Sequence, residues 1–135
     1  MKYRVLIVTA NYYTDISNNL LKDAKTTLKS KANYQIINVP GVFEIPVIIA
    51  KNIKKYHGFI ALGCVIKGET PHFDFISNTT INAIMNLSIV HKKPIGNGIL
   101  TCLSKRQAKA RSGSFNKVGK GTEAAKAVLS VLNNS

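Results

Sequence analysis

The sequence predicts an α/β fold in which a parallel sheet is covered by helices on both faces. Short apolar runs rich in Val and Ile alternate with segments whose apolar residues recur at helical spacing. No internal repeat, low-complexity segment or interdomain linker interrupts this alternation. The chain has 135 residues, of which 45% are hydrophobic, so it is long enough to bury a complete core. We therefore expect one domain spanning residues 1–135.

The first part of the chain predicts a strand, a helix and a second strand. Residues 3–9 form a continuous β-prone run, which is typical of a strand buried on both faces. Apolar residues then recur at helical spacing over 16–31, and Asp15 or Ser17 is the expected cap near the start of this helix. Residues 34–39 predict the second strand.

The middle of the chain continues the alternation. Pro46 fits the first turn of a helix over 46–56. Residues 58–66 predict a third strand, a tight loop follows it, and a long helix is expected over 72–90. The fourth strand is expected over 94–100.

Two C-terminal helices, over 104–111 and 122–132, complete the expected order. In the second of them, Ala125, Val128 and Leu132 lie on one apolar stripe. Alternating strands and helices predict right-handed crossovers, and sheets of this kind bind ligands outside the carboxyl ends of their strands. We therefore expect the functional residues in the loops that follow the strands.

The chain carries a large positive charge, because 19 Lys and Arg stand against 6 Asp and Glu, giving a formal net charge of +13. Such a charge attracts polyanions. However, 16 of the cations are Lys, whereas base and phosphate recognition favours Arg. The cations are also scattered along the sequence, and the abundance of Asn and Ile beside them is typical of an AT-rich genome. We expect attraction of small anionic substrates and no dedicated nucleic-acid partner.

The cysteine count and the hydropathy pattern indicate a compartment. Two cysteines, Cys64 and Cys102, are too few for a secreted disulfide scaffold, so we expect a cytoplasmic protein in which both are small buried side chains. The apolar start of the chain has no signal-peptide cleavage pattern, and no run approaches the roughly 18 apolar residues of a membrane span. No zinc-ligand spacing, dinucleotide glycine motif or P-loop motif is present.

Several polar residues in the expected loops could carry chemistry. His72 opens a helix after the third strand, where it could transfer protons beside a phosphate bound at the helix start, with the Thr70 hydroxyl as a donor. Glu44 lies in an apolar turn, where it could accept hydrogen bonds from a polyol or an amino group, and the neighbouring Phe43 could offer an aromatic face to a planar ring. Each also has a purely structural interpretation: His72 could cap or pack, and Glu44 could complement a helix dipole.

The remaining candidates have equally strong structural interpretations. Arg111 and Lys120 flank a glycine-containing loop that could hold an anion, but solvated surface charges would give the same pattern. His57 and His91 are expected to close helices, where a cation suits the dipole.

Four segments then occur together in a fixed order. They are residues 40–46 (PGVFEIP), 61–74 (ALGCVIKGETPHFD), 94–101 (PIGNGILT) and 117–125 (KVGKGTEAA). Together they closely resemble the 6,7-dimethyl-8-ribityllumazine synthase family, and the similarity covers essentially the whole chain. Four motifs in order are far more specific than any single one.

The resemblance implies a flavodoxin-like three-layer α/β/α sandwich around a four-stranded parallel sheet, in agreement with the fold expected above. It implies a transferase that carries out the penultimate step of riboflavin biosynthesis. In this step 5-amino-6-(D-ribitylamino)uracil condenses with 3,4-dihydroxy-2-butanone 4-phosphate to give the lumazine, phosphate and water. No metal or organic cofactor is needed. Members are homopentamers or pentamer-based shells with sites between subunits. The short N-terminus and a lengthened loop in this chain favour the free pentamer.

The resemblance also assigns roles by position. His72 matches the catalytic proton donor. The ribitylaminouracil is held by residues matching Tyr12, Val42, Phe43, Glu44, Cys64, Val65 and Ile66, with the Tyr12 ring stacked on the pyrimidine and Glu44 on the ribityl hydroxyls. The butanone phosphate is received by positions matching Glu69 and Thr70, with Lys120 nearby. Asn97 and Arg111 match positions that the neighbouring subunit contributes, and Arg111 grips the phosphate.

This chain departs from the family pattern at three places. Asn97 stands where many members carry Phe, so one wall of the ring pocket is expected to be polar. Lys67 replaces a frequent Arg, and the loop between Arg111 and Lys120 is one residue longer than the common form.

Three alternatives remain beside the synthase. A riboflavin synthase of the same fold would need no phosphate site, so the pair Thr70 and Arg111 argues against it. A degenerate synthase kept as a flavin-binding shell is opposed by the intact set of site residues. A basic nucleic-acid binder would show saturable binding to random duplex DNA with a steep salt dependence.

Overall fold

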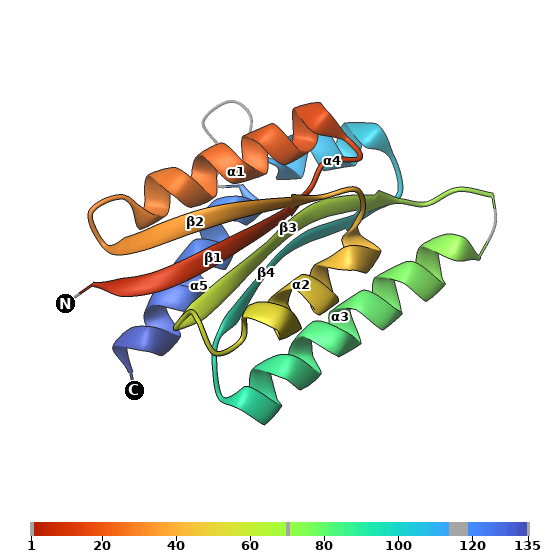
Figure 1. Cartoon of the computed structure of the whole chain (residues 1–135). Helices are drawn as coiled ribbons and strands as arrows, with labels where there is room; N and C mark the ends of the chain where they lie inside the picture. The colour runs from red at the N-terminus through yellow and green to blue at the C-terminus, as the bar shows by residue number, and fades with distance from the viewer. Residues whose placement is uncertain (1, 70, 114–118, 135) are drawn as a thin grey trace.

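The computed structural model describes residues 2–69, 71–113 and 119–134. In this part of the chain the strands are β1 (Tyr3–Ala10), β2 (Ala32–Val39), β3 (Gly58–Ile66) and β4 (Ile95–Cys102). All pair in parallel, in the order β2-β1-β3-β4. Helices lie on both faces of this sheet (Figure 1). The expected α/β/α sandwich around a four-stranded parallel sheet is confirmed.

The helices divide between the two faces of the sheet. Helices α1 (Thr14–Leu28), α4 (Lys105–Arg111) and α5 (Lys120–Asn133) pack on one face, and the short 3-10 helix η1 (Val42–Glu44), α2 (Ile45–Asn52) and α3 (His72–His91) pack on the other (Figure 1). Strand β1 alternates between these layers, because Val5 and Ile7 belong to one hydrophobic cluster and Leu6 and Val8 to the other. Burial on both faces explains why this strand is a continuous apolar run.

The elements differ from the expected ranges chiefly at the ends of the helices. Helix α1 begins at Thr14, two residues before the expected start, so the expected cap at Asp15 or Ser17 is wrong. Tyr13 occupies the N-cap position without a side-chain hydrogen bond, and the Ser17 hydroxyl donates to the Tyr13 carbonyl oxygen at 3.0 Å. The helix ends at Leu28, because Ser30 adopts a positive φ of 65°.

Helix α2 is shorter than expected, and His57 does not close it. The helix ends at Asn52, whose side-chain amide donates to the Ile48 carbonyl oxygen, and turns follow. His57 lies further on, where its Nδ1 accepts a hydrogen bond from the Arg4 backbone N–H at 2.8 Å. His57 therefore lies five residues beyond the end of α2, and the expected role of closing that helix is wrong. His91, in contrast, is the last residue of α3.

The strands are aligned closely enough that all of them begin at one edge of the sheet and end at the other. Tyr3 of β1 is paired with Ala32, the first residue of β2, and β4 pairs from its first residue with Phe59 near the start of β3. The sheet therefore has an amino edge and a carboxyl edge, and the loops that follow the strands meet at the carboxyl edge. In the described residues no helix is long and apolar enough to cross a bilayer.

Candidate active site

A cleft of about 440 Å³ opens at the carboxyl edge of the sheet, where β1, β2 and β3 end. Its wall brings together seven of the residues that the resemblance assigns to substrate: Tyr12, Val42, Phe43, Cys64, Val65, Ile66 and His72. Three further residues line it that the sequence did not indicate: Tyr13, Gly41 and Ile76. Segments far apart in the sequence thus form one cavity, as expected for a sheet of this topology.

The aromatic side of the cleft comes from the loop after β1 and from η1. Tyr12 is 75% exposed and stands edge-on to Tyr13, with ring centroids 4.9 Å apart. Phe43 is 57% exposed. The N–H of Asn11 donates to the Val39 carbonyl oxygen at 3.0 Å, which ties the loops after β1 and β2 together. Two largely exposed aromatic side chains on linked loops suit a planar ligand that would cover them.

The floor of the cleft is the end of β3. Gly63 allows this strand to approach η1 closely, because a Cβ on Gly63 would lie 2.6 Å from Cγ1 of Val42. Burial, with smaller contributions from Cys102 and Asp15, raises the pKa of Cys64 to about 12. Cys64 is therefore a neutral thiol at physiological pH and a poor nucleophile.

Glu44 lies beside the cleft, half-buried at the end of η1. Its N–H donates to the Gly41 carbonyl oxygen at 3.2 Å, and a Cβ on Gly41 would lie only 3.3 Å from its Oε1. The carboxylate is thus held against the turn that lines the cleft. It can accept hydrogen bonds from hydroxyl groups there.

The third side of the cleft is the start of α3. His72 is the first residue of this 20-residue helix and is exposed to solvent, and Pro71 is its N-cap. The N–H groups of Asp74 and Phe75 donate to the Pro71 carbonyl oxygen. Glu69 is exposed just before this turn, and Thr70 lies outside the described residues. The beginning of a long helix beside an imidazole offers an anion site and a proton carrier together.

The residues expected from the neighbouring subunit, together with Lys120, line a second cavity, of about 580 Å³, on the far side of β4. Asn97, Arg111 and Lys120 line it, and in the described residues no side chain lines both cavities. Nη1 of Arg111 lies 4.0 Å from Sγ of Cys102, and Nζ of Lys120 lies 3.9 Å from the Glu123 carboxylate. One copy of the chain therefore divides the expected site into two separated halves.

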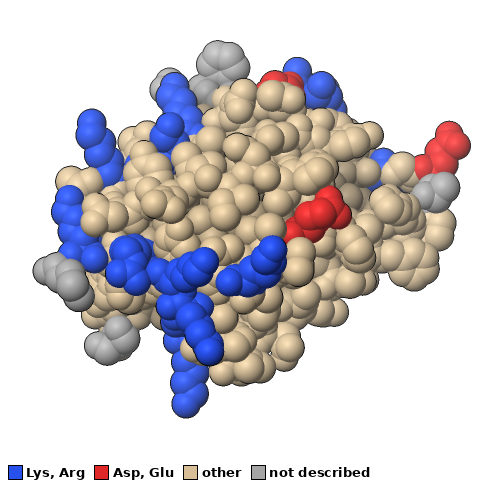
Figure 2. All heavy atoms as spheres, viewed as in Figure 1, with Lys and Arg blue, Asp and Glu red and all other residues tan. Residues whose placement is uncertain are grey.

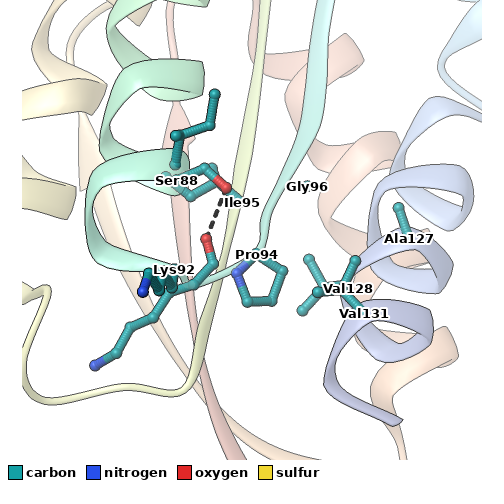
Figure 3. A pocket seen from close by; sticks show the side chains of 10 residues that line it. Ser88, Lys92, Pro94, Ile95, Gly96, Ala127, Val128 and Val131 are labelled. Carbon is teal, nitrogen blue, oxygen red and sulfur yellow. Dashed lines mark hydrogen bonds between the residues drawn. The ribbon is translucent and has the colours of Figure 1, made fainter. Parts of the chain in front are cut away.

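A third cavity, of about 410 Å³, lies near the amino edge between α3 and α5 and contains none of the expected site residues. Figure 3 shows its apolar wall, with Pro94 facing Val128. The Ser88 hydroxyl donates to the Lys93 carbonyl oxygen at 2.7 Å and closes one end (Figure 3). Lys92 and Lys93 also line it, and Nζ of Lys93 is already bound to the carbonyl oxygens of Ile53 and Tyr56. In the described residues no carboxylate or imidazole lines this cavity, unlike the cleft with His72.

One of the missed cleft residues could have been found from the sequence. Ile76 follows His72 by four positions, a spacing that places two side chains on the same face of a helix. Nothing in the sequence shows that Tyr13 lines the cleft as well as Tyr12.

Burial is the main cause that raises the pKa of Tyr13, and Tyr12 and Cys64 add to it. In the described residues no group of three His, Cys, Asp or Glu side chains could hold a metal ion.

Known proteins resemble this chain over almost its entire length. The profile of the 6,7-dimethyl-8-ribityllumazine synthase family matches residues 2–135. The chain belongs to this family. It is 48% identical to the 6,7-dimethyl-8-ribityllumazine synthase of Bartonella henselae over 97% of this chain and 87% of the relative. It is 44% identical to that of Agrobacterium fabrum, over 97% of this chain and 93% of the relative.

Membership confirms what the four motifs implied about identity and function. The chain is an enzyme of the lumazine synthase family, a transferase of riboflavin biosynthesis whose family reaction is the condensation described above. The role of each side chain in the cleft stays a prediction.

Proposed function

We propose that this chain condenses 5-amino-6-(D-ribitylamino)uracil with 3,4-dihydroxy-2-butanone 4-phosphate in the cleft at the carboxyl edge of the sheet. The products are 6,7-dimethyl-8-ribityllumazine, inorganic phosphate and water. One observation carries the proposal: seven expected residues from four separate segments line a single cavity of about 440 Å³. A cavity of this size, mostly apolar with a few polar groups, suits a small ligand.

The pyrimidine ring binds between the aromatic loop and the end of β3. Tyr12 and Phe43 offer exposed ring faces, and stacking on a planar heterocycle would remove both from water. Backbone groups at Val65 and Ile66 meet the edge of the ring. The Glu44 carboxylate accepts hydrogen bonds from the ribityl hydroxyls, because an ionised carboxylate is an acceptor only.

The butanone phosphate binds at the beginning of α3. A helix leaves its first N–H groups without intrahelical partners, and its dipole favours an anion there. Glu69 and Thr70 precede this position in the sequence. Arg111, a planar guanidinium suited to phosphate oxygens, supplies the balancing charge, and Lys120 adds a second cation.

His72 transfers protons during the reaction. Imine formation, phosphate elimination and ring closure each move a proton to or from nitrogen or oxygen, and an imidazole can do both near neutral pH. Its position at the mouth of the cleft supports this role. Cys64 does not compete, because its raised pKa keeps it protonated.

The working unit is a homopentamer in which each site is shared by two neighbouring subunits. The separation of the cleft from the cavity of Asn97, Arg111 and Lys120 supports this arrangement, since one copy does not combine the two. Exposed apolar side chains along α3 are further support, because such residues mark contacts between proteins: Phe75, Met85, Ile89 and Val90.

The enzyme works as one domain in the cytoplasm without metal or organic cofactor. Both cysteines are free and buried, which suits a reducing compartment. The proposed steps need only proton transfer and anion binding, and side chains and a helix terminus supply both.

An optical assay tests the proposal. Purified protein with both substrates at neutral pH should form the lumazine well above a control without enzyme, which is essential because the condensation also proceeds uncatalysed. A rate equal to that control, from folded oligomeric protein, would overturn the proposed reaction. A dilute sample shown to be monomeric should be inactive, and turnover by monomers would overturn the shared site.

A further inference from the structure

The amino edge of the sheet carries a concentration of positive charge that the proposed reaction does not use. About half of the 19 Lys and Arg residues lie at the beginning of a strand, in the loop before one, or in the last turn of the preceding helix. We call these residues the basic edge: Lys2, Arg4, Lys25, Lys29, Lys31, Lys51, Lys54, Lys55, Lys92 and Lys93. Figure 2 shows Lys and Arg gathered over the end where β1 begins.

The acidic residues lie elsewhere. They occur in loops after strands or within helices, away from the helix ends that meet the basic edge: Asp15, Asp23, Glu44, Glu69, Asp74 and Glu123. In the part of the chain that the structure describes, the ion pairs join Asp15 and Glu123 to lysines of α4 and α5. No carboxylate neutralises the basic edge in these pairs.

Helix dipoles explain only part of this charge. Helices α1, α2 and α3 end at this edge, and cations are favourable beside their exposed carbonyl groups. Lys93 fills this role, since its Nζ donates to the carbonyl oxygens of Ile53 and Tyr56 at 2.6 and 2.9 Å. The side chains of Lys29, Lys31 and Lys54 are exposed and, among the described residues, have no hydrogen-bond or ion-pair partner.

A small groove of about 260 Å³ lies within the basic edge, lined by Arg4, Asn33, Tyr34, Gln35, Lys55 and Tyr56. The Arg4 guanidinium is held in place, because its Nε and Nη2 donate to the Lys55 carbonyl oxygen at 3.2 and 2.9 Å. The Tyr56 hydroxyl donates to Oε1 of Gln35 at 2.7 Å, which leaves the amide nitrogen of Gln35 as a donor. The groove thus presents cations and oriented N–H donors together.

We propose that the basic edge binds the phosphodiester backbone of a nucleic acid. Lysine ammonium groups act as point charges for phosphates, and binding of this kind is independent of base sequence. Arg4 and Gln35 add directional hydrogen bonds to phosphate oxygens. The cations looked scattered along the sequence, but the parallel topology brings the segments that carry them to one edge.

A lipid surface fits this edge less well. Ile89, Val90 and Val131 are exposed in the last turns of α3 and α5, near Lys92. Among the described residues, however, no exposed large hydrophobic side chain lies in the loops that carry Lys29, Lys31 and Lys54. A membrane-binding surface would combine cations with such side chains. The proposal is independent of the reaction, because no residue of the basic edge lines the cleft.

Two triple variants with the same change in charge test the proposal. The edge variant replaces Lys29, Lys31 and Lys54 by Gln. The control variant replaces Lys22, Arg106 and Lys126 by Gln, which are exposed residues on helices away from the edge. The probe is a fluorescein-labelled random DNA duplex of about 20 base pairs, followed by fluorescence anisotropy over a range of salt concentrations.

We expect saturable binding by the parent protein and binding at least about fivefold weaker in the edge variant. The slope of log affinity against log salt should become shallower by about 0.9 for each phosphate that the edge variant no longer neutralises. The control variant should stay within about twofold of the parent. Equal weakening of both variants, absence of saturable binding, or equally tight binding to phosphatidylserine vesicles or polyglutamate would overturn the proposal. Lumazine formation by the same samples should not change, so the two proposals fail separately.

Discussion

Oδ1 of Asn97 accepts a hydrogen bond from the backbone N–H of Ile99, 3.0 Å away. Both residues lie on β4, which is an edge strand because β3 is its only neighbour in the sheet of described residues. The side-chain oxygen of Asn97 therefore gives a hydrogen-bond partner to a backbone N–H on the side of β4 that has no neighbouring strand. It does so while lining the cavity of Arg111 and Lys120, where the resemblance expects an aromatic ring. Asn97 has a local structural role that a phenyl ring could not fill.

Replacing Asn97 by Phe should therefore lower the stability of the protein and raise its affinity for the ribitylaminouracil. Loss of the hydrogen bond should lower the free energy of unfolding by about 1 kcal/mol, because the bond is only partly buried. A stacked ring should tighten binding of the ribitylaminouracil about fivefold to tenfold. Denaturant unfolding and titration calorimetry measure the two effects. Asn97→Leu, which lacks a ring, is the control, and the expectation fails if it tightens binding equally.

His72→Ala should slow lumazine formation by about tenfold to a hundredfold, because a positioned proton carrier is lost. Substrate binding should remain within about twofold of the parent, since the aromatic side chains of Tyr12 and Phe43 and the end of β3 are unchanged. His91→Ala, at the opposite end of the same helix, is the matched control and should keep the parental rate. Equal rates for His72→Ala and the parent would remove His72 from the mechanism.

Gly113 is held in a conformation that other residues avoid. Its φ is +97°, and its Cα faces the Asp23 carboxylate so closely that an added Cβ would collide with Oδ2. Gly119 meets the same carboxylate, since its Cβ would lie 2.7 Å from that oxygen. Asp23 is partly shielded there, and burial raises the pKa of its carboxyl despite the opposing effect of Lys22.

Gly113→Ala should consequently lower the free energy of unfolding by about 1–3 kcal/mol. Gly68→Ala is the control, because a Cβ there meets nothing within 4 Å, and it should change stability by less than about 0.5 kcal/mol. Denaturant unfolding of both variants measures the difference. Equal stabilities would show that the backbone at Gly113 relaxes freely.

The buried thiol of Cys64 should make the protein sensitive to alkali. Its pKa in the folded state is about 12, against an ordinary value of 9.0, so the folded state retains the proton that the unfolded state loses in this interval. The free energy of unfolding should thus fall by up to about 1.4 kcal/mol per pH unit between these values. Cys64→Ala should show a flatter decline over the same range. Identical pH profiles for variant and parent would contradict the raised pKa.

The fold could be predicted from the sequence because hydrophobic periodicity specifies the buried faces of each element. The range expected for the third strand, 58–66, is the range of β3. Helix ends were less accurate, because they depend on contacts between segments. The Asn52 side chain donates a hydrogen bond to the Ile48 carbonyl oxygen of its own helix, and Ser30 adopts a positive φ after α1. Hydrophobic periodicity indicates neither feature.

The candidate site could be predicted only as a set of segments. The resemblance identified seven residues from Tyr12 to His72, and the parallel sheet brings them to one cleft. The cleft and the cavity of Arg111 are separate because β4 lies at the edge of the sheet. The position of β4 depends on the order of the strands in the sheet. The basic edge was missed for a related reason, because its cations become neighbours only when the strands align.

Mixing two impaired variants tests the shared site most directly. Arg111→Ala should mainly raise the requirement for the phosphorylated substrate, and His72→Ala should slow turnover. When the two are unfolded together and reassembled in equal amounts, about one quarter of the interfaces should regain both residues, since neighbours combine at random in a symmetric ring.

The control mixes the parent protein with the doubly substituted chain. A site shared between neighbours should leave about one quarter of the parental activity in this mixture as well, whereas a site within one chain would leave about one half. The shared site predicts about one quarter of the parental rate of lumazine formation in both mixtures. Activity equal to the mean of the two single variants in the first mixture would contradict it.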